Sequence, residues 1–235
     1  MISVFDIYKV GIGPSSSHTG GPMKAGKEFI DELRSKGKLR EITRITVDLY
    51  GALSLTGKGH NTDIAIIMGL AGNLPEDVDI ESIPSFIARL EKSERLPVGM
   101  HCHTVSFPYN KSIHFHNTNL KLHENGMQIH AWIENEKVLS KTYYSIGGGF
   151  IVDEENFGKQ EEQLVKVPYE YSTAEELIKH CKTEGLSISS LVLENEKSLR
   201  PDGNIQAQFT HIWKTMRESM DRGMNTQGVL PGPMR

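Results

Sequence analysis

The pattern of apolar and polar positions predicts an N-terminal part that mixes strands and helices. Apolar residues alternate with polar ones over residues 45–49, which predicts a half-buried strand. The same alternation over 127–133, a turn at 134–136 and an apolar return over 138–146 predict an antiparallel meander within residues 103–146. We therefore expect an α+β fold with an antiparallel sheet in this part of the chain.

Helical spacing of apolar residues predicts a helix directly after the glycine- and serine-rich loop 11–22. Gly37 is the expected end of this helix, and its start at either Ser17 or Pro22 stays open. Thr62 is positioned to cap a second, short helix over residues 63–70.

A further helix is expected within residues 77–92, and the pattern after Pro168 is helical throughout. Ser172 and Glu175 have the spacing of a capping box, and Gly185 is the expected end of that helix. The final helix carries an apolar stripe that needs a partner, formed by Ile205, Phe209, Ile212, Trp213, Met216 and Met220.

The glycine run 147–149 and the acidic stretch 153–162 predict a boundary between these two parts. We expect a first domain over residues 1–152, a linker over 153–170 and an all-helical segment over 171–235.

Composition and charge narrow the class of protein. With 26 Lys and Arg against 30 Asp and Glu, the net charge of −4 argues against a nucleic-acid-binding face. The longest apolar run, residues 64–71, is too short to span a bilayer, and no basic region marks a signal peptide. We expect a cytoplasmic protein without membrane or nucleic-acid partners, in which Cys102 and Cys181 are reduced thiols.

The loop 11–22 is the strongest candidate for chemistry. Its residues Ser15, Ser16, Ser17 and Thr19 place hydroxyl and backbone N–H groups at the positive end of a helix dipole, which suits a carboxylate or a phosphate. Serine clusters before helices also serve as simple caps, and on the pattern alone both interpretations stay open.

Histidines supply two further candidates. His60 precedes a helix start, where the dipole favours the neutral imidazole that a general base needs, although a lone loop histidine is more often a surface residue. The pairs His101/His103 and His114/His116 each place two imidazoles on one strand face and suit a transition metal. Such pairs without a further ligand at suitable spacing are usually a polar sheet face, so we expect no metal site there.

Longer motifs resemble a known family, the bacterial iron–sulfur L-serine dehydratases, or L-serine ammonia-lyases, of the single-chain type. The most extended match is the run SVFDIYKVGIGPSSSHT from Ser3 to Thr19. The resemblance covers essentially the whole chain and includes residues 48–51, 55–60, 66–70, 123–126, 140–144, 147–150, 222–226 and 229–233.

The resemblance implies an activity in amino-acid degradation and gluconeogenesis: L-serine loses water, and the enamine hydrolyses to pyruvate and ammonia. A 4Fe-4S cluster acts as Lewis acid, and a protein base removes the Cα proton. Ser15, Ser16, Ser17, His18 and Thr19 would bind the serine carboxylate, and we interpret His60 as the base.

The cysteine content departs from the family, because neither Cys102 nor Cys181 lies in a cluster motif. The chain then corresponds to the family's β domain and the first helices of its α domain, inactive by itself and a homodimer when complete. The resemblance also implies a β domain similar to the allosteric substrate-binding domain of phosphoglycerate dehydrogenases. Two alternatives are a stand-alone L-serine-binding regulatory module and, more remotely, a metal-binding protein that uses His103 and His116.

Overall fold

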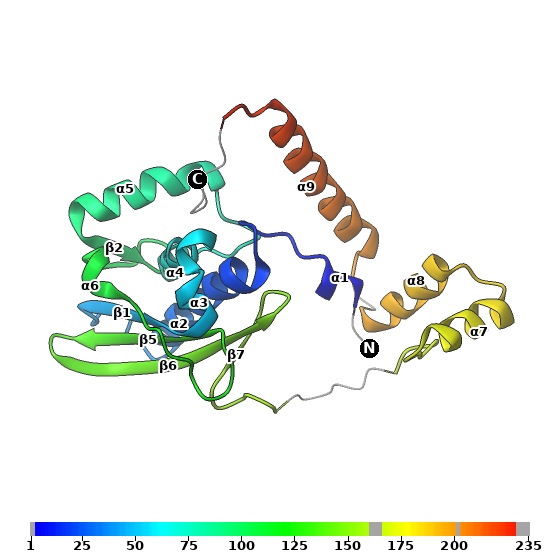
Figure 1. The fold of residues 1–235 in the computed structure, drawn as a ribbon, viewed down its shortest axis with the longest axis horizontal. Coiled ribbons are helices and arrows are strands. Elements are labelled where there is room, and N and C mark those ends of the chain that lie inside the picture. Colours follow the sequence, from blue (N-terminus) through cyan, green and yellow to red (C-terminus); the bar gives the residue numbers. More distant parts are fainter. Residues whose placement is uncertain (1–2, 160–165, 201–202, 229–235) are drawn as a thin grey trace. The chain divides into compact units, whose positions relative to one another are not determined.

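The computed structural model describes residues 3–159, 166–200 and 203–228 (Figure 1). Residue contacts divide these into two compact units. We call residues 11–159 the sheet unit, and residues 3–10 with 166–228 the helical unit. The contacts thus group residues 3–10 with the later helices, whereas the domain boundaries expected from the sequence stay a prediction.

A seven-stranded sheet organises the sheet unit, with the strand order β2-β3-β1-β5-β6-β7 and with β4 also paired to β1. Its strands are β1 (Arg44–Leu49), β2 (Arg95–Val98), β3 (His103–Ser106), β4 (Ile113–Phe115), β5 (Gly126–Ile133), β6 (Glu136–Gly147) and β7 (Phe150–Asp153).

The sheet is mixed, which corrects the expectation of an antiparallel sheet. The antiparallel pair β5–β6 confirms the later part of the predicted meander, but β3 and β4 both run parallel to β1. These two strands lie one after the other along the same edge of β1, joined through the short helix α6 (Tyr109–Ser112). Alternation along a strand reports its half-burial but not the direction of its neighbour, so the sequence could not reveal this pairing.

The glycine run 147–149 forms a turn inside the sheet. Gly147, Gly148 and Gly149 have φ angles of 99°, 59° and 73°, a conformation that side chains rarely allow. The turn brings β7 back beside β6, so the sheet continues to Asp153.

Two long helices pack on the same side of this sheet and on each other (Figure 1). These are α2 (Gly21–Ser35) and α4 (Thr62–Ala71), and nine of the ten residues of α4 are buried. A Cβ at Gly69 would overlap the carbonyl oxygen of Met23, so glycine permits the close approach of the two backbones. Because of this close packing, the N-terminal ends of α2 and α4 lie beside one another.

The remaining elements of the sheet unit are short helices and α5. A π-helical turn, η1 (Ser16–Gly20), leads directly into α2, which resolves where this helix begins. The others are α3 (Gly51–Leu55), the 3₁₀ turns η2 (Gly57–His60) and η3 (Ile80–Ser82), and α5 (Ile83–Ser93). Helix α5 confirms the helix expected within residues 77–92 and ends one residue later.

The helical unit contains α1 (Val4–Ile7), α7 (Ala174–Glu184), α8 (Ile188–Leu199) and α9 (Ile205–Asn225). Glu196 of α8, which is buried, accepts hydrogen bonds from Ser3 Oγ at 2.8 Å and from the Val4 amide at 2.6 Å. These bonds, with the contact of Phe5 and Phe209 rings 4.9 Å apart, hold α1 on the later helices.

The observed ends of these helices can be compared with the caps predicted from the sequence. The predicted end at Gly185 is confirmed, with φ of 65°. The capping box uses Thr173 and Glu176 and not the predicted pair Ser172 and Glu175. Both pairs have the spacing of a capping box, so the sequence alone could not distinguish them. The apolar stripe of α9 remains exposed in the described chain, most clearly at Trp213, Met216 and Met220. Among the described helices, none has the length and apolar character that crossing a membrane requires.

Candidate functional site

Two loops from distant parts of the sequence meet where α2 and α4 begin. Thr62 Oγ1 donates a hydrogen bond to the carbonyl oxygen of His18 at 2.6 Å, and Thr19 Oγ1 donates one to the carbonyl oxygen of His60 at 3.0 Å. Each loop therefore fixes the backbone of the other. Thr62 is the first residue of α4 and not its side-chain cap, so the predicted capping role was wrong: its hydroxyl is used to join the loops.

The serine loop combines a cap with an exposed polar surface. Ser15 Oγ accepts the His18 amide N–H at 3.2 Å and so caps η1, which bears out the simple capping interpretation for this residue. Ser17 Oγ lies 3.3 Å from Ser15 Oγ, and the side chain of Ser16 is exposed. Because the first N–H groups of a helix lack acceptors within it, those of Ser16 and Ser17 can serve an anion.

The two histidines of the loops face one another, with ring centroids 4.9 Å apart. Burial lowers the pKa of His18, and the charge of nearby His60 lowers it further, against a weaker raising effect of the Ala52 backbone and Glu124. His18 therefore favours its neutral form near pH 7.

The hydrogen bonds of the two imidazoles distinguish their roles. His60 Nδ1 lies 2.9 Å from the carbonyl oxygen of Thr56. A carbonyl only accepts, so Nδ1 carries the proton and the neutral ring has its lone pair on Nε2. His18 Nδ1 lies 2.9 Å from Ser17 Oγ, and the His18 ring is also hydrogen-bonded to the backbone of Ala52. Of the two rings, His60 therefore keeps Nε2 as the basic nitrogen of its neutral form.

Lys24 and the glycine turn between β6 and β7 lie beside the serine loop. A Cβ placed on Gly149 would lie 3.8 Å from the Ser16 carbonyl oxygen and 3.9 Å from Lys24 Nζ. The turn between β6 and β7 therefore lies beside both residues. Lys24 follows the serines by about two helical turns, but nothing in the sequence showed that the glycine turn would meet it there.

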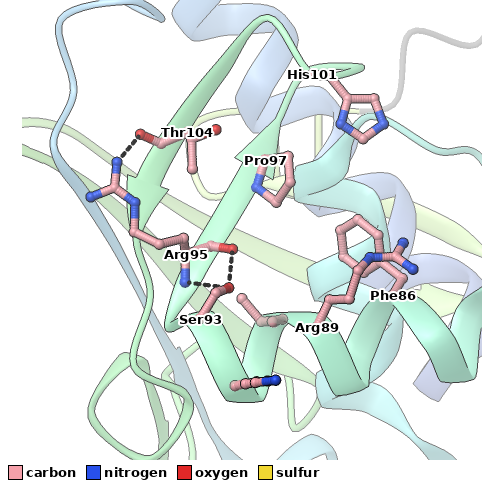
Figure 2. Close-up of a pocket in the computed structure, with 9 residues that line it drawn as sticks. Phe86, Arg89, Ser93, Arg95, Pro97, His101 and Thr104 are labelled. Atoms are coloured by element: carbon pink, nitrogen blue, oxygen red, sulfur yellow. Dashed lines mark hydrogen bonds between the residues drawn. The ribbon is translucent and has the colours of Figure 1, made fainter.

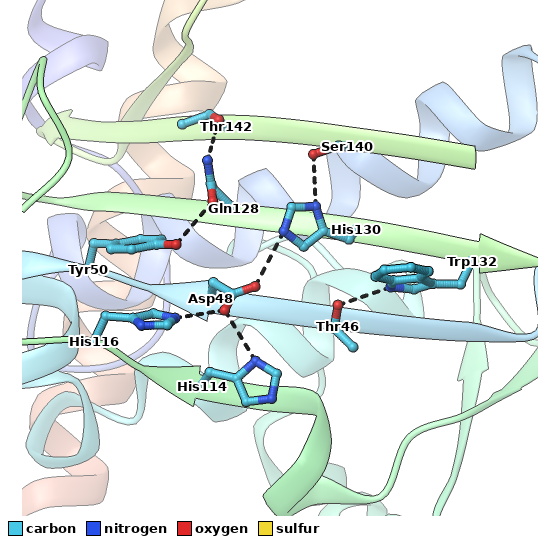
Figure 3. Close-up of polar contacts among 10 residues, drawn as sticks. All are labelled: Thr46, Asp48, Tyr50, His114, His116, Gln128, His130, Trp132, Ser140 and Thr142. Carbon is cyan, nitrogen blue, oxygen red and sulfur yellow. Dashed lines mark hydrogen bonds and ion pairs between the residues drawn. The ribbon is translucent and has the colours of Figure 1, made fainter. Parts of the chain in front are cut away.

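The opposite face of β1 carries a separate polar cluster around Asp48 (Figure 3). One carboxylate oxygen lies 2.7 Å from His116 Nε2 and 3.2 Å from His114 Nδ1, and the other lies 3.3 Å from His130 Nε2. Burial raises the pKa of Asp48, but the hydrogen bonds of His130 and His116 and the nearby His114 outweigh it and hold this pKa well below its usual range.

Metal ligation finds little support in these histidines. Within the part of the chain that the structure describes, no group of three or more His, Cys, Asp or Glu side chains is arranged to hold a metal ion. His114 lies in β4 and His116 directly follows this strand, and both engage Asp48. His101 lies outside β3 with φ of 65°, so the predicted pairing of His101 with His103 on one strand face was wrong.

The thiols of the chain do not fit an iron–sulfur cluster. A 4Fe-4S cluster is held by about four cysteine thiolates. The chain has two cysteines, both free, of which Cys102 is exposed between β2 and β3 and Cys181 lies in α7 of the helical unit. No step of the chemistry is therefore assigned to a cluster held by this chain.

Comparison with known proteins identifies the family. The model of the family described as "Serine dehydratase beta chain" matches residues 3–156. The chain belongs to this family. It is 60% identical to L-serine dehydratase 1 of Escherichia coli and 54% identical to L-serine dehydratase of Haemophilus influenzae, in each case over the whole chain and 52% of the relative.

A more distant relative, L-serine dehydratase of Helicobacter pylori, is 34% identical over 99% of this chain and 51% of that protein. The chain thus spans about half the length of the curated relatives it matches. The resemblance inferred from the motifs is confirmed at the level of the serine dehydratase beta chain.

Proposed function

We propose that this chain provides the substrate-binding site and the base of an L-serine ammonia-lyase. The observation that carries the proposal is the reciprocal pair of hydrogen bonds between Thr62 and His18 and between Thr19 and His60. These bonds bring a serine-rich helix start and two imidazoles to one place, which is what binding a carboxylate and removing a neighbouring proton require.

In this proposal the carboxylate of L-serine binds at Ser15, Ser16 and Ser17. His18 and Thr19 fix the shape of the loop, Thr19 through its hydrogen bond to the carbonyl oxygen of His60. His60 Nε2 accepts the Cα proton as the electron pair of the C–H bond forms the Cα–Cβ double bond. The β-hydroxyl leaves with the C–O electron pair as hydroxide, and this hydroxide with the proton taken up by His60 makes up the water that is lost. Elimination of water gives the enamine, whose hydrolysis releases pyruvate and ammonia. The 4Fe-4S cluster of the complete enzyme would be held by cysteines outside this chain.

The remaining expectations about the whole enzyme are part of the same proposal. They are a cytoplasmic homodimer and a β domain similar to the allosteric substrate-binding domain of phosphoglycerate dehydrogenases. The alternative, an L-serine-binding regulatory module without catalysis, is favoured by one observation: Ser15–Thr19 and His60 all belong to the sheet unit. Turnover separates the two, because a regulatory site does not need a base.

The test replaces the matching stretch of E. coli L-serine dehydratase 1 with this chain and measures pyruvate formation from L-serine. His60→Ala should lower kcat by about 100- to 10,000-fold, because the base contributes to the transition state. Lys121→Ala, an exposed residue, is the matched control and should leave kcat unchanged. A change confined to KM in the His60 variant would remove the role of base and favour the regulatory alternative.

A further inference from the structure

A cavity of about 550 Å³ lies between α5 and the hairpin formed by β2 and β3 (Figure 2). Its size is typical of sites for small molecules. It shares no residue with the loops that hold His18 and His60. The residues that line it are Phe86, Arg89, Leu90, Lys92, Ser93, Arg95, Pro97, His101 and Thr104.

The lining combines an apolar floor with basic side chains and contains no acidic residue. Phe86 and Leu90 of α5 and Pro97 of β2 supply the apolar surface, and Figure 2 shows Pro97 between the side chains of Arg95 and Phe86. Arg89 and Lys92 are three residues apart on α5, which places both on the same side of the helix.

The three permanent cations of this cavity have neutral hydrogen-bond partners or none among the residues that the structure describes. Arg89 donates to Ser85 Oγ at 3.2 Å, and Arg95 donates to the carbonyl oxygen of Thr104 at 3.5 Å. Among the described residues, no ion pair joins Arg89, Lys92 or Arg95 to a carboxylate. The positive charge at this cavity is therefore available to a ligand.

Charge is segregated around α5. The acidic residues Glu91 and Glu94 line a different cavity, with Tyr109 and Lys111, on the other side of the helix. The basic residues therefore do not serve to neutralise the acidic residues of their own helix.

The backbone beside the cavity adopts an unusual conformation that places His101. Gly99, Met100 and His101 have φ angles of 58°, 59° and 65° in succession. Non-glycine residues rarely adopt this region, and such positions concentrate at functional sites. The turn is anchored by Arg34, whose Nη2 donates to the Gly99 carbonyl oxygen at 3.0 Å, so the conformation belongs to a fixed structure.

We propose that this cavity binds an organic anion with an apolar body. The carboxylate or phosphate of the ligand lies against Arg89 and Lys92, with Arg95 adding positive charge and His101 offering a ring N–H. Its apolar part lies on Phe86, Leu90 and Pro97. This is a second ligand site of the sheet unit, beyond the proposed L-serine site, and it stands independently of that function.

The test measures calorimetric binding of two probes, phenylpyruvate and phenyl phosphate, to the whole chain. At least one probe should bind saturably, and the probe that binds shows whether the site takes a carboxylate or a phosphate. The double variant Arg89→Gln/Lys92→Gln should weaken that binding at least about tenfold, because each cation forms charge-assisted contacts. Both side chains are exposed, so we expect the variant to fold, and its thermal unfolding checks this.

Two controls make the result specific. Arg40→Gln/Lys121→Gln removes the same two charges from exposed positions outside the cavity and should bind the probe as the unchanged chain does. Benzyl alcohol, which has the ring without the charge, should not bind. Equal weakening in both double variants, no saturable binding of either probe, or inorganic phosphate binding as tightly as phenyl phosphate would overturn the proposal.

Discussion

The tautomer of His60 decides what the two loops can do chemically. Its Nδ1 is occupied by the carbonyl of Thr56, which leaves Nε2 as the basic nitrogen of the neutral ring. The His18 ring is hydrogen-bonded to Ser17 and to the backbone of Ala52. Two adjacent histidines in one site therefore have different capacities, and the difference comes from hydrogen bonds that are not visible in the sequence.

The lowered pKa of His18 predicts a pH dependence of stability. An unfolded histidine titrates near 6.5, and folding lowers this pKa through burial and the neighbouring His60. The unfolded chain then binds the proton more readily, so His18 stabilises the fold above pH 6.5 relative to lower pH. Stability should fall as pH drops from 6.5 towards the lowered pKa.

This effect can be isolated with His18→Gln, compared with the exposed His211→Gln. The difference in Tm between pH 7.5 and pH 5.5 should be smaller in the His18 variant than in the His211 variant and in the unchanged chain. Identical pH dependence in all three proteins would show that His18 does not resist protonation in the folded state.

The packing of helix α2 on helix α4 brings together the two loops that carry His18 and His60. Both loops lead into these helices, so the distance between His18 and His60 depends on the contact at Gly26 and Gly69. A Cβ at Gly26 would lie 2.8 Å from the Ile66 carbonyl oxygen, which shows that neither backbone has room to move closer.

Gly69→Ala should therefore separate the helices and destabilise the protein by about 1–3 kcal/mol, the usual cost of overpacking. Gly223→Ala is the matched control, because Gly223 also lies in a helix but has open space around its Cα. That change should stabilise α9 by about 0.5–1 kcal/mol. Urea unfolding of both variants measures this contrast, and a Gly69 variant as stable as the unchanged chain would contradict the tight contact.

Helices and strands that depend on neighbouring residues were predicted well from the sequence, whereas contacts between distant residues were not. Gly185 ends α7 as expected because a C-terminal glycine acts within one turn. The parallel pairing of β3 with β1 joins Arg44 to Ser106 across more than sixty residues, and no pattern in either strand specifies it. The candidate site shows the same limit: Ser15–Thr19 and His60 were predicted separately, whereas Thr62 and Lys24 joined the site only through tertiary packing.

At the scale of the whole molecule, the two compact units and the two cysteines limit what the chain does by itself. The residues proposed to bind L-serine and to remove its proton lie in the sheet unit. The chain spans about half the length of its relatives, and its two thiols do not suffice for a 4Fe-4S cluster.

We therefore expect the purified chain to form no pyruvate from L-serine, even after anaerobic incubation with iron and sulfide. The chimera with E. coli L-serine dehydratase 1, assayed under the same conditions, is the positive control. Turnover by the chain alone would show that it completes the reaction without further residues. This result would contradict the proposal that the cluster-binding residues of the enzyme lie outside this chain.

The most direct test of the proposed L-serine site is calorimetric titration of the 235-residue chain with L-serine, with D-serine as the stereochemical control. We expect saturable binding of L-serine only. We also expect binding to weaken at least about tenfold in Ser16→Ala/Ser17→Ala, since each hydrogen bond to a charged carboxylate is worth about 1.5–3 kcal/mol. Absent binding, equal binding of both enantiomers, or unchanged affinity in the double variant would contradict the assignment of the serine loop as the substrate site.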